Sequence, residues 1–211
     1  MTTALLSSTY FGPIQWYQKL NSYEKCLIER CDSFIKQTYR NRCIIATTGG
    51  KQVLSIPIVH ETGTRFMRDV RISNYGNWRH LHWNALLSAY GESPFFDFYA
   101  DDIRPFFEKH WEFLFDFNME IMWKMCDLLQ LEPHVNTTDE YVFLPADTRL
   151  DTTEARFVDF RDVIHPKHPL IDREFEPQKY YQVYTQKHGF QANLSILDLL
   201  FNEGNEAILY L

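Results

Sequence analysis

The chain has 211 residues, of which 45% are hydrophobic, 16% aromatic and 23% charged, as in a soluble globular protein of one domain with a sizeable core. Acidic residues outnumber basic ones by 28 to 21, a formal net charge of −7. That balance argues against nucleic acid or an anionic membrane as a partner, so any anion must be bound by a local group of cations.

The sequence also limits where the protein works. The N-terminal residues lack the pattern of a secretory signal, and no apolar run approaches the roughly 20 residues of a membrane helix. The four cysteines show no Cys-x-x-Cys spacing and are expected to be reduced thiols. We therefore expect a cytoplasmic protein without membrane insertion. Its oligomeric state is not indicated by any pattern.

The first third of the chain predicts a strand over 3–9, a helix from Pro13 to about Tyr23, a strand over 25–30, and a hairpin over 43–59 that turns at Gly49-Gly50. Strand, short helix and strand in succession make a unit whose two strands are parallel and whose crossover is right-handed. The hairpin follows directly after a polar stretch.

The middle of the chain predicts a strand over 69–73, a helix over 78–90 that closes near Gly91, a helical stretch over 94–103 interrupted at Pro105, and a long amphipathic helix over 107–131 stopped by Pro133. The stripe of apolar residues on the long helix indicates core packing: Trp111, Leu114, Phe115, Ile121, Met122, Met125, Leu128 and Leu129.

The last part predicts an irregular connection over 145–180, a strand near 180–184, and a C-terminal helix that Ser195 caps and Gly204 ends. Together the elements indicate an α/β or mixed α+β fold: a small parallel sheet with a hairpin, flanked by amphipathic helices, plus a C-terminal helical extension. We expect one domain over 1–211, with a core of about 1–145 and the irregular connection, strand and helix over 146–211.

A cationic stretch stands out between two apolar runs: Lys36-Gln37-Thr38-Tyr39-Arg40-Asn41-Arg42-Cys43, here called the cationic knot. In an open α/β sheet, ligands bind beyond the carboxyl ends of the strands, and the knot follows the second strand. Arginine forks suit phosphate or carboxylate. The alternatives are that these cations lie on solvated faces, as charged residues usually do, or that the knot is a packing device.

Two histidines occur in the helix over 78–90. His80 and His82 lie about 200° apart on a helix, so they cannot share a metal ion. His82 falls on the apolar face, which favours a core residue, although at the floor of a pocket it could act as a general base. His165 and His168, in His-Pro-Lys-His-Pro, are assigned to a loop. No motif for a metal or a cofactor is present, and none is predicted.

The chain resembles the WbqC-like protein family through segments that follow one another in the family's order: 10–15, 36–42 with its Asn41-Arg42 step, 54–57, 69–72, Trp78-x3-His82-x6-Ala89-Tyr90-x3-Pro94-Phe95, and 193–201. Many members carry Gln-Pro before the aromatic pair and a glycine near position 15, where this chain has Ser8-Thr9 and Gln15. The resemblance implies a role in bacterial polysaccharide or O-antigen biosynthesis, in which such proteins are described as transferases.

Two functions remain open from the sequence. One is a transferase for a small anionic substrate, either a nucleotide-linked sugar or an activated acyl donor, and the other is a non-catalytic metabolite- or partner-binding module of a glycan pathway. We expect the segments 9–15, 36–42 and 78–90 to border one pocket. The expected roles are an anion clamp of Lys36, Arg40 and Arg42, a base at His82, and substrate contacts from Tyr10, Gln15, Asn41 and Tyr90.

Overall fold

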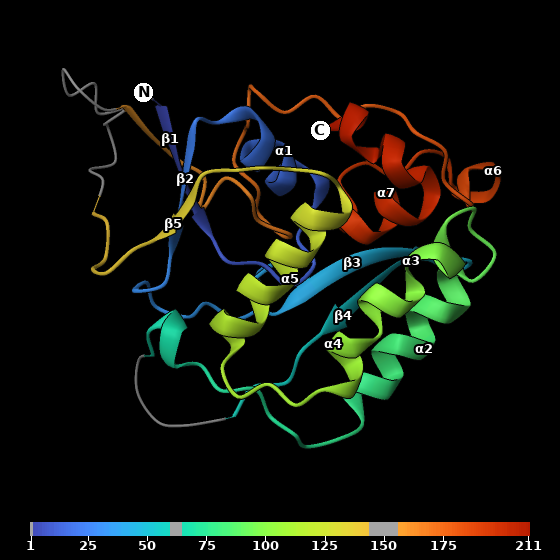
Figure 1. The fold of residues 1–211 in the computed structure, drawn as a ribbon, viewed down its shortest axis with the longest axis horizontal. Helices are drawn as coiled ribbons and strands as arrows, with labels where there is room; N and C mark the ends of the chain where they lie inside the picture. Colours follow the sequence, from blue (N-terminus) through green and yellow to red (C-terminus); the bar gives the residue numbers. More distant parts are fainter. Residues whose placement is uncertain (1, 60–64, 144–155) are drawn as a thin grey trace.

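The fold is built on a four-stranded parallel sheet, seen in the computed structural model, which describes residues 2–59, 65–143 and 156–211 (Figure 1). Its strands are β1 (Thr2–Ser7), β2 (Lys25–Glu29), β5 (Val135–Thr137) and β6 (Arg156–Asp159), in the order β5-β2-β1-β6. The helix α1 (Ile14–Ser22) connects β1 to β2, which pair in parallel. The predicted strand–helix–strand unit and the mixed α/β class are confirmed.

The central strand β1 is covered on both faces. Ala4, Leu5 and Leu6 are fully buried, although successive side chains of a strand point to opposite sides of the sheet. A continuous apolar run of this kind is typical of a parallel strand packed between two layers. It fixes the position of the segment that follows, Ser8-Thr9-Tyr10, which leaves the sheet at the carboxyl end of β1.

The predicted hairpin is also confirmed. It consists of β3 (Arg42–Thr47) and β4 (Gly50–Ser55), with Arg42 opposite Ser55 at its open end. Gly50 has φ 105, in the left-handed region that a residue with a Cβ avoids. The hairpin forms its own two-stranded sheet, and β3 contacts both α2 (Trp78–Tyr90) and α7 (Ile196–Glu203).

The remaining described helices are α3 (Phe96–Ile103), α4 (Pro105–Glu108), α5 (Leu114–Leu128), α6 (Thr185–His188) and two 3-10 segments, Met67–Asp69 and Gly204–Tyr210. In Figure 1, α2, α3 and α4 gather on the side of the hairpin away from the parallel sheet. Within the described ranges, the structure contains no helix with the length and apolar character needed to cross a membrane.

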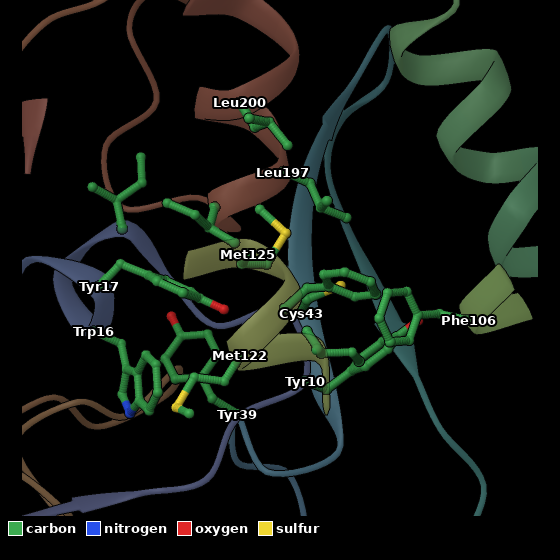
Figure 2. Close-up of a cluster of buried hydrophobic side chains, with 14 of the residues drawn as sticks. Tyr10, Trp16, Tyr17, Tyr39, Cys43, Phe106, Met122, Met125, Leu197 and Leu200 are labelled. Atoms are coloured by element: carbon green, nitrogen blue, oxygen red, sulfur yellow. The ribbon is translucent and has the colours of Figure 1, made fainter. Parts of the chain in front are cut away.

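The core lies where α1, α5, α7 and the hairpin meet. Figure 2 shows Trp16 and Tyr17 of α1 on one side and Phe106 of α4 on the other, with Met122 and Met125 of α5 between them. All of these side chains are at most 7% exposed. Large aromatic side chains each bury about 150–250 Å², so they supply much of the stabilisation of this core.

The strand predicted over 69–73 is wrong. These residues follow the 3-10 segment Met67–Asp69 and make only single bridges, Ile58 with Ile72 and Arg71 with Phe113. The alternation that suggested a strand exists, because Val70 and Ile72 are buried and Arg71 is exposed. The alternation belongs to an extended segment that forms one bridge to Ile58 and another to Phe113.

The long helix predicted over 107–131 is interrupted. The helix α4 ends at Glu108 and α5 begins at Leu114. Between them Glu112 accepts a hydrogen bond from Ile72 N and Leu114 N donates to Val70 O, so backbone groups that a continuous helix would use internally bind the extended segment. The helix α5 ends before Pro133, at a left-handed Gln130 (φ 57) whose neighbour Leu131 N reaches back to Cys126 O.

The predictions for the last third need two corrections. The connection predicted to be irregular contains β6, which pairs with β1 in the parallel sheet. The strand predicted near 180–184 is absent from the structure, because Tyr180 and Gln182 direct their side chains to the Asp198 carboxylate and their backbone joins no sheet. The C-terminal helix is confirmed: Ser195 Oγ accepts a hydrogen bond from Leu197 N, and Gly204 (φ 58) ends α7.

Candidate functional site

The parallel strands bring three segments together at one edge of the sheet. Ser7 ends β1, Glu29 ends β2 and Asp159 ends β6, and these three ends lie at the same edge. The chain moves from β1 to β2 on one side, whereas β6 lies on the other side of β1. Ligands of open α/β sheets bind at such a switch point, which here lies between β1 and β6 and is called the sheet edge.

A narrow cavity lies at the sheet edge, with walls that include Ser7, Thr9, Trp16, Tyr39, Arg40 and Arg161. Its volume of about 10 Å³ has room for about one water molecule. Ser7 Oγ, Thr9 Oγ1 and Arg40 Nε are all buried without a hydrogen-bond partner among the residues that the structure describes. Buried polar atoms normally have partners, so three such atoms beside one cavity indicate a place for water or a polar ligand group.

Two arginines at this edge are held by carboxylates. Arg40, 5% exposed, is paired with Asp32. Burial raises the pKa of Asp32, and the charge of Arg40 opposes that rise. Arg161 contacts Glu29 Oε2 at 3.1 Å and Asp159 Oδ2 at 2.6 Å. Burial alone would lower the pKa of Arg161, but its hydrogen bonds and charge interaction with Asp159 raise it. These guanidinium groups are charged and fixed.

Arg42 differs from both. It is the first residue of β3 and is half-buried, and among the described residues it has no carboxylate partner. Its Nε is buried without a hydrogen-bond partner, and burial lowers its pKa. Removing a cation from water without a counter-charge is costly, so Arg42 is less well stabilised than the two paired arginines.

The other two polar residues predicted in the knot are placed differently. Lys36 is exposed on the loop before the hairpin. Asn41 Nδ2 donates to Ile56 O at 2.9 Å, which ties the knot to the end of β4, while its Oδ1 is buried without a partner. Asn41 therefore anchors the backbone beside Arg42.

The loop with His165 and His168 contacts the knot, a placement that the sequence did not predict. Lys167 Nζ bonds Gln37 Oε1 of the knot. Burial lowers the pKa of His165, and electrostatic interactions with His168, Arg40 and Arg42 lower it further. Lys167 N and His168 N both donate to His165 Nδ1 at 3.1 Å, so the neutral ring carries its hydrogen on Nε2 and is a donor there.

His82 lies in the core, 6% exposed. Its Nδ1 is 2.9 Å from the hydroxyl of Tyr10, which is fully buried, and Trp78 packs against the ring. Burial lowers the pKa of His82 to about 4, against a hydrogen bond with the backbone of Ser55. His82 is thus neutral at pH 7 and does not line the sheet-edge cavity. Its role as a base stays a prediction.

The three segments expected around one pocket do meet, but inside the protein. Tyr10 N donates to Tyr39 O at 2.9 Å, and the Tyr10 side chain reaches His82. Gln15 Nε2 instead donates to Asp172 Oδ2 at 2.8 Å. The Tyr90 hydroxyl donates to Asp198 and accepts from Ala46 N. The structure therefore joins the first and third of these segments through the Tyr10–His82 contact, and it places Gln15 and Tyr90 in other networks.

The model of the WbqC-like protein family matches residues 8–210. The chain belongs to the WbqC-like protein family. Among curated proteins, this WbqC-like chain is 25% identical over 225 residues to the uncharacterized protein Rv1507c of Mycobacterium tuberculosis (strain ATCC 25618 / H37Rv), an alignment that covers 99% of the chain and 96% of that protein. No solved structure matched the chain.

The segments that resemble the WbqC-like family at the two ends of the chain bind each other. Ile14 N donates to Leu194 O, Ile196 N donates to Gly12 O, and Ser195 Oγ donates to Phe11 O. In this WbqC-like protein the stretch after β1 is therefore fixed by the start of α7. Within the described residues, no group of three or more histidine, cysteine, aspartate or glutamate side chains is arranged to hold a metal ion.

Proposed function

We propose that this WbqC-like protein binds a small anionic substrate at the sheet edge and acts as a transferase of bacterial glycan or polysaccharide biosynthesis. The substrate class is a nucleotide-linked sugar or an activated acyl donor. The glycan setting comes from the resemblance to the family, whereas the anionic substrate rests on the residues of the sheet edge.

The observation that carries the proposal is the state of Arg42. The protein has a net charge of −7, so carboxylates are plentiful, yet this half-buried guanidinium has none beside it in the described parts of the chain. Burial lowers its pKa and its Nε has no partner. A phosphate or carboxylate at this position would supply the missing charge and accept two parallel hydrogen bonds from the fork.

The site is also held ready for binding. Arg42 begins β3 and pairs with Ser55, so its backbone is fixed by the hairpin. Arg40 is fixed by Asp32, and its charge acts on the same imidazole, His165. Groups that are ordered before binding lose less entropy when the ligand arrives. The sheet-edge cavity has room for only one water, so the ligand itself would bind outside it, at Arg42, which is not one of the residues that line the cavity.

The chemistry that this arrangement supports is stabilisation of a leaving group. With a nucleotide-linked sugar, an acceptor oxygen would bond to the anomeric carbon while the bond from that carbon to the diphosphate oxygen breaks. The diphosphate would leave with the electron pair, and the acceptor's proton would pass to a base. The charges of Arg42 and Arg40 would stabilise the negative charge that develops on the diphosphate.

The alternative is a non-catalytic binding module that uses the same sheet edge. The observation in its favour is the position of His82, the base predicted from the sequence. The ring is buried against Tyr10 and is outside the sheet-edge cavity, so it could take a proton from a substrate only after the core had opened.

A thermal-shift screen of the whole protein, followed by an assay for release, distinguishes a transferase from a non-catalytic binding module. Nucleotide sugars, acyl-coenzyme A thioesters and inorganic phosphate would each be added at a hundredfold excess over the expected dissociation constant, where a ligand specific for the folded state stabilises it by about 2.7 kcal/mol. We expect a shift with one organic class that Arg42→Ala removes and Arg71→Ala, a change at an exposed arginine paired with Glu112, retains. With hydroxyl and amine acceptors present, release of nucleotide or coenzyme A from that ligand would indicate a transferase, and binding without release would indicate the module.

A further inference from the structure

A larger cavity opens at the start of α2, separate from the sheet edge. Its volume is about 370 Å³, within the range of small-molecule sites. The walls include Asn74, Arg79, His80, Trp83, Arg104 and Phe107. None of these residues lines the sheet-edge cavity, so the two sites are distinct.

Arg79 is the cation of this cavity that has no counter-charge. Among the described residues it has no carboxylate partner, its Nε is buried without a hydrogen-bond partner, and burial lowers its pKa. Its position is nevertheless fixed: Nη2 donates to Asn74 Oδ1 at 3.0 Å, and the guanidinium lies 4.6 Å from the centre of the Trp78 ring. A half-buried guanidinium that is held in place beside an open cavity, without a carboxylate, is suited to bind an anion.

Two other arginines that lie over aromatic rings do have carboxylate partners, unlike Arg79. Arg68 and Arg71 also lie over aromatic rings, at 5.2 and 4.8 Å from the ring centres. Arg68 has Asp69 at 3.8 Å and Arg71 is paired with Glu112. Stacking on a ring therefore does not by itself leave an arginine of this protein without a carboxylate.

The other polar groups of the cavity leave room for an anion. Glu108, which also lines the cavity, is paired with Arg104 at 2.6 Å. Asn74 Oδ1 accepts from His110 Nδ1 at 3.2 Å as well as from Arg79, so this ring nitrogen is a donor. The N-cap residue of α2, Asn77, makes no side-chain capping bond. The charges that line the cavity sum to a positive value without the histidines, and the start of α2 adds to this positive potential.

An aromatic wall completes the cavity. Trp83 and Phe107 both line it, and their ring centres are 5.9 Å apart. Aromatic side chains contact planar ligands well and contribute large contact areas. We propose that this cavity binds a planar aromatic ring that carries a phosphate or carboxylate group, with the anionic group on Arg79 and the ring against Trp83 and Phe107. This site is independent of the one proposed at the sheet edge.

Calorimetry on the full chain tests the proposal with phenyl phosphate and benzoate as probes. We expect at least one of them to bind, and to bind more tightly than inorganic phosphate or benzyl alcohol, because the first lacks the ring and the second lacks the charge. Arg79→Ala should weaken binding by about tenfold to a hundredfold, the range for a lost hydrogen bond to a charged group. The preferred probe tells whether phosphate or carboxylate is the natural anionic group.

Two controls locate the site. Arg71→Ala removes an arginine that lies over a ring but has its own carboxylate, so this variant should bind the probe as the wild type does. Arg42→Ala removes the arginine of the other proposed anion site, and a loss of binding in that variant would place the probe there instead. If Arg79→Ala fails to fold, Arg79→Gln and the shift of the Trp83 indole N–H signal in an NMR titration answer the same question. Equal affinity of the Arg79 variants and the wild type, an unmoved Trp83 signal, loss of binding in Arg42→Ala, or no binding of either aromatic probe at millimolar concentration would each overturn the proposal.

Discussion

The Tyr10 hydroxyl lies 2.9 Å from His82 Nδ1, and both side chains are buried. The pair joins the segment that leaves β1 to the middle of α2. Burial lowers the pKa of His82, so its ring is neutral at pH 7 and the buried pair carries no charge. The pair therefore ties the sheet edge to the helical side of the protein.

His82→Gln tests whether this pair serves the fold. We expect a loss of about 1–3 kcal/mol in the free energy of unfolding, because the change disturbs buried hydrogen bonds. Urea denaturation measures it. His80→Gln is the matched control, since His80 is exposed on the same helix and bonds only Asn84 among the described residues, and it should change stability by less than about 0.5 kcal/mol. An unchanged stability together with lost turnover would identify His82 as the base instead.

The pH dependence of stability should show two opposing contributions. Burial raises the pKa of Asp198 to about 6, so between about pH 4 and 6 the folded state holds a proton that the unfolded state releases, and stability falls as pH rises. Burial lowers the pKa of His82 to about 4, so between about pH 4 and 6.5 the unfolded state holds the extra proton, and stability rises with pH.

Variants separate these contributions. Relative to wild type, His82→Gln should lose stability as pH rises from 4 to 6, and Asp198→Asn should gain it, each by up to about 3 kcal/mol for a shift of two pKa units. Denaturation curves at several pH values give the differences, in which all other titrating groups cancel. Parallel curves for the three proteins would show that neither group titrates differently in the folded state.

Removing one partner of the Arg40–Asp32 ion pair should destabilise the fold more than replacing both partners by apolar residues. Both side chains are over 90% buried, so Arg40→Met leaves a buried carboxylate uncompensated and should cost about 3–5 kcal/mol. The double variant Arg40→Met/Asp32→Leu should recover much of this loss. Chemical denaturation of the single and double variants measures the coupling. A double variant as unstable as the sum of the single changes would contradict it.

The four cysteines should be unreactive in the folded protein. Cys26, Cys31, Cys43 and Cys126 are all buried, and burial raises the pKa of Cys26 and of Cys126 to about 12. Because the thiolate is the reactive form, Ellman's reagent should modify the native protein slowly and release four equivalents after denaturation. Rapid modification of Cys26 or Cys126 under native conditions would show that the core opens around α1 and α5.

Local patterns predicted the elements that are stabilised by their own sequence. The helix over 78–90 matches α2, and the glycine pair marks the hairpin turn, because period and turn residues are local properties. The strand β6 was missed because four residues carry little periodicity, and its partner β1 lies over 150 residues earlier in the chain. The interruption before α5 depends on hydrogen bonds to Val70 and Ile72, which a helical pattern cannot reveal.

The candidate site, too, could be predicted from the sequence only in part. The sequence singled out Arg40 and Arg42 as unusual cations in an acidic chain, and in the structure Arg40 is buried and Arg42 is half-buried. It did not show which arginine is paired, because Asp32 and Arg40 become neighbours only in the fold. Nor did spacing within His-Pro-Lys-His-Pro indicate that this loop bonds Gln37, over 120 residues away.

The central claim is that Arg42 holds an anionic group, and calorimetry with the best organic ligand of the thermal-shift screen tests it most directly. Arg42→Lys keeps the charge and loses the fork, so it should weaken binding measurably, and Arg42→Ala should weaken it by about tenfold to a hundredfold. Arg71→Ala should bind as wild type does. Equal affinity of wild type, Arg42→Lys and Arg42→Ala would contradict the account and leave the knot a role in the fold or on the surface.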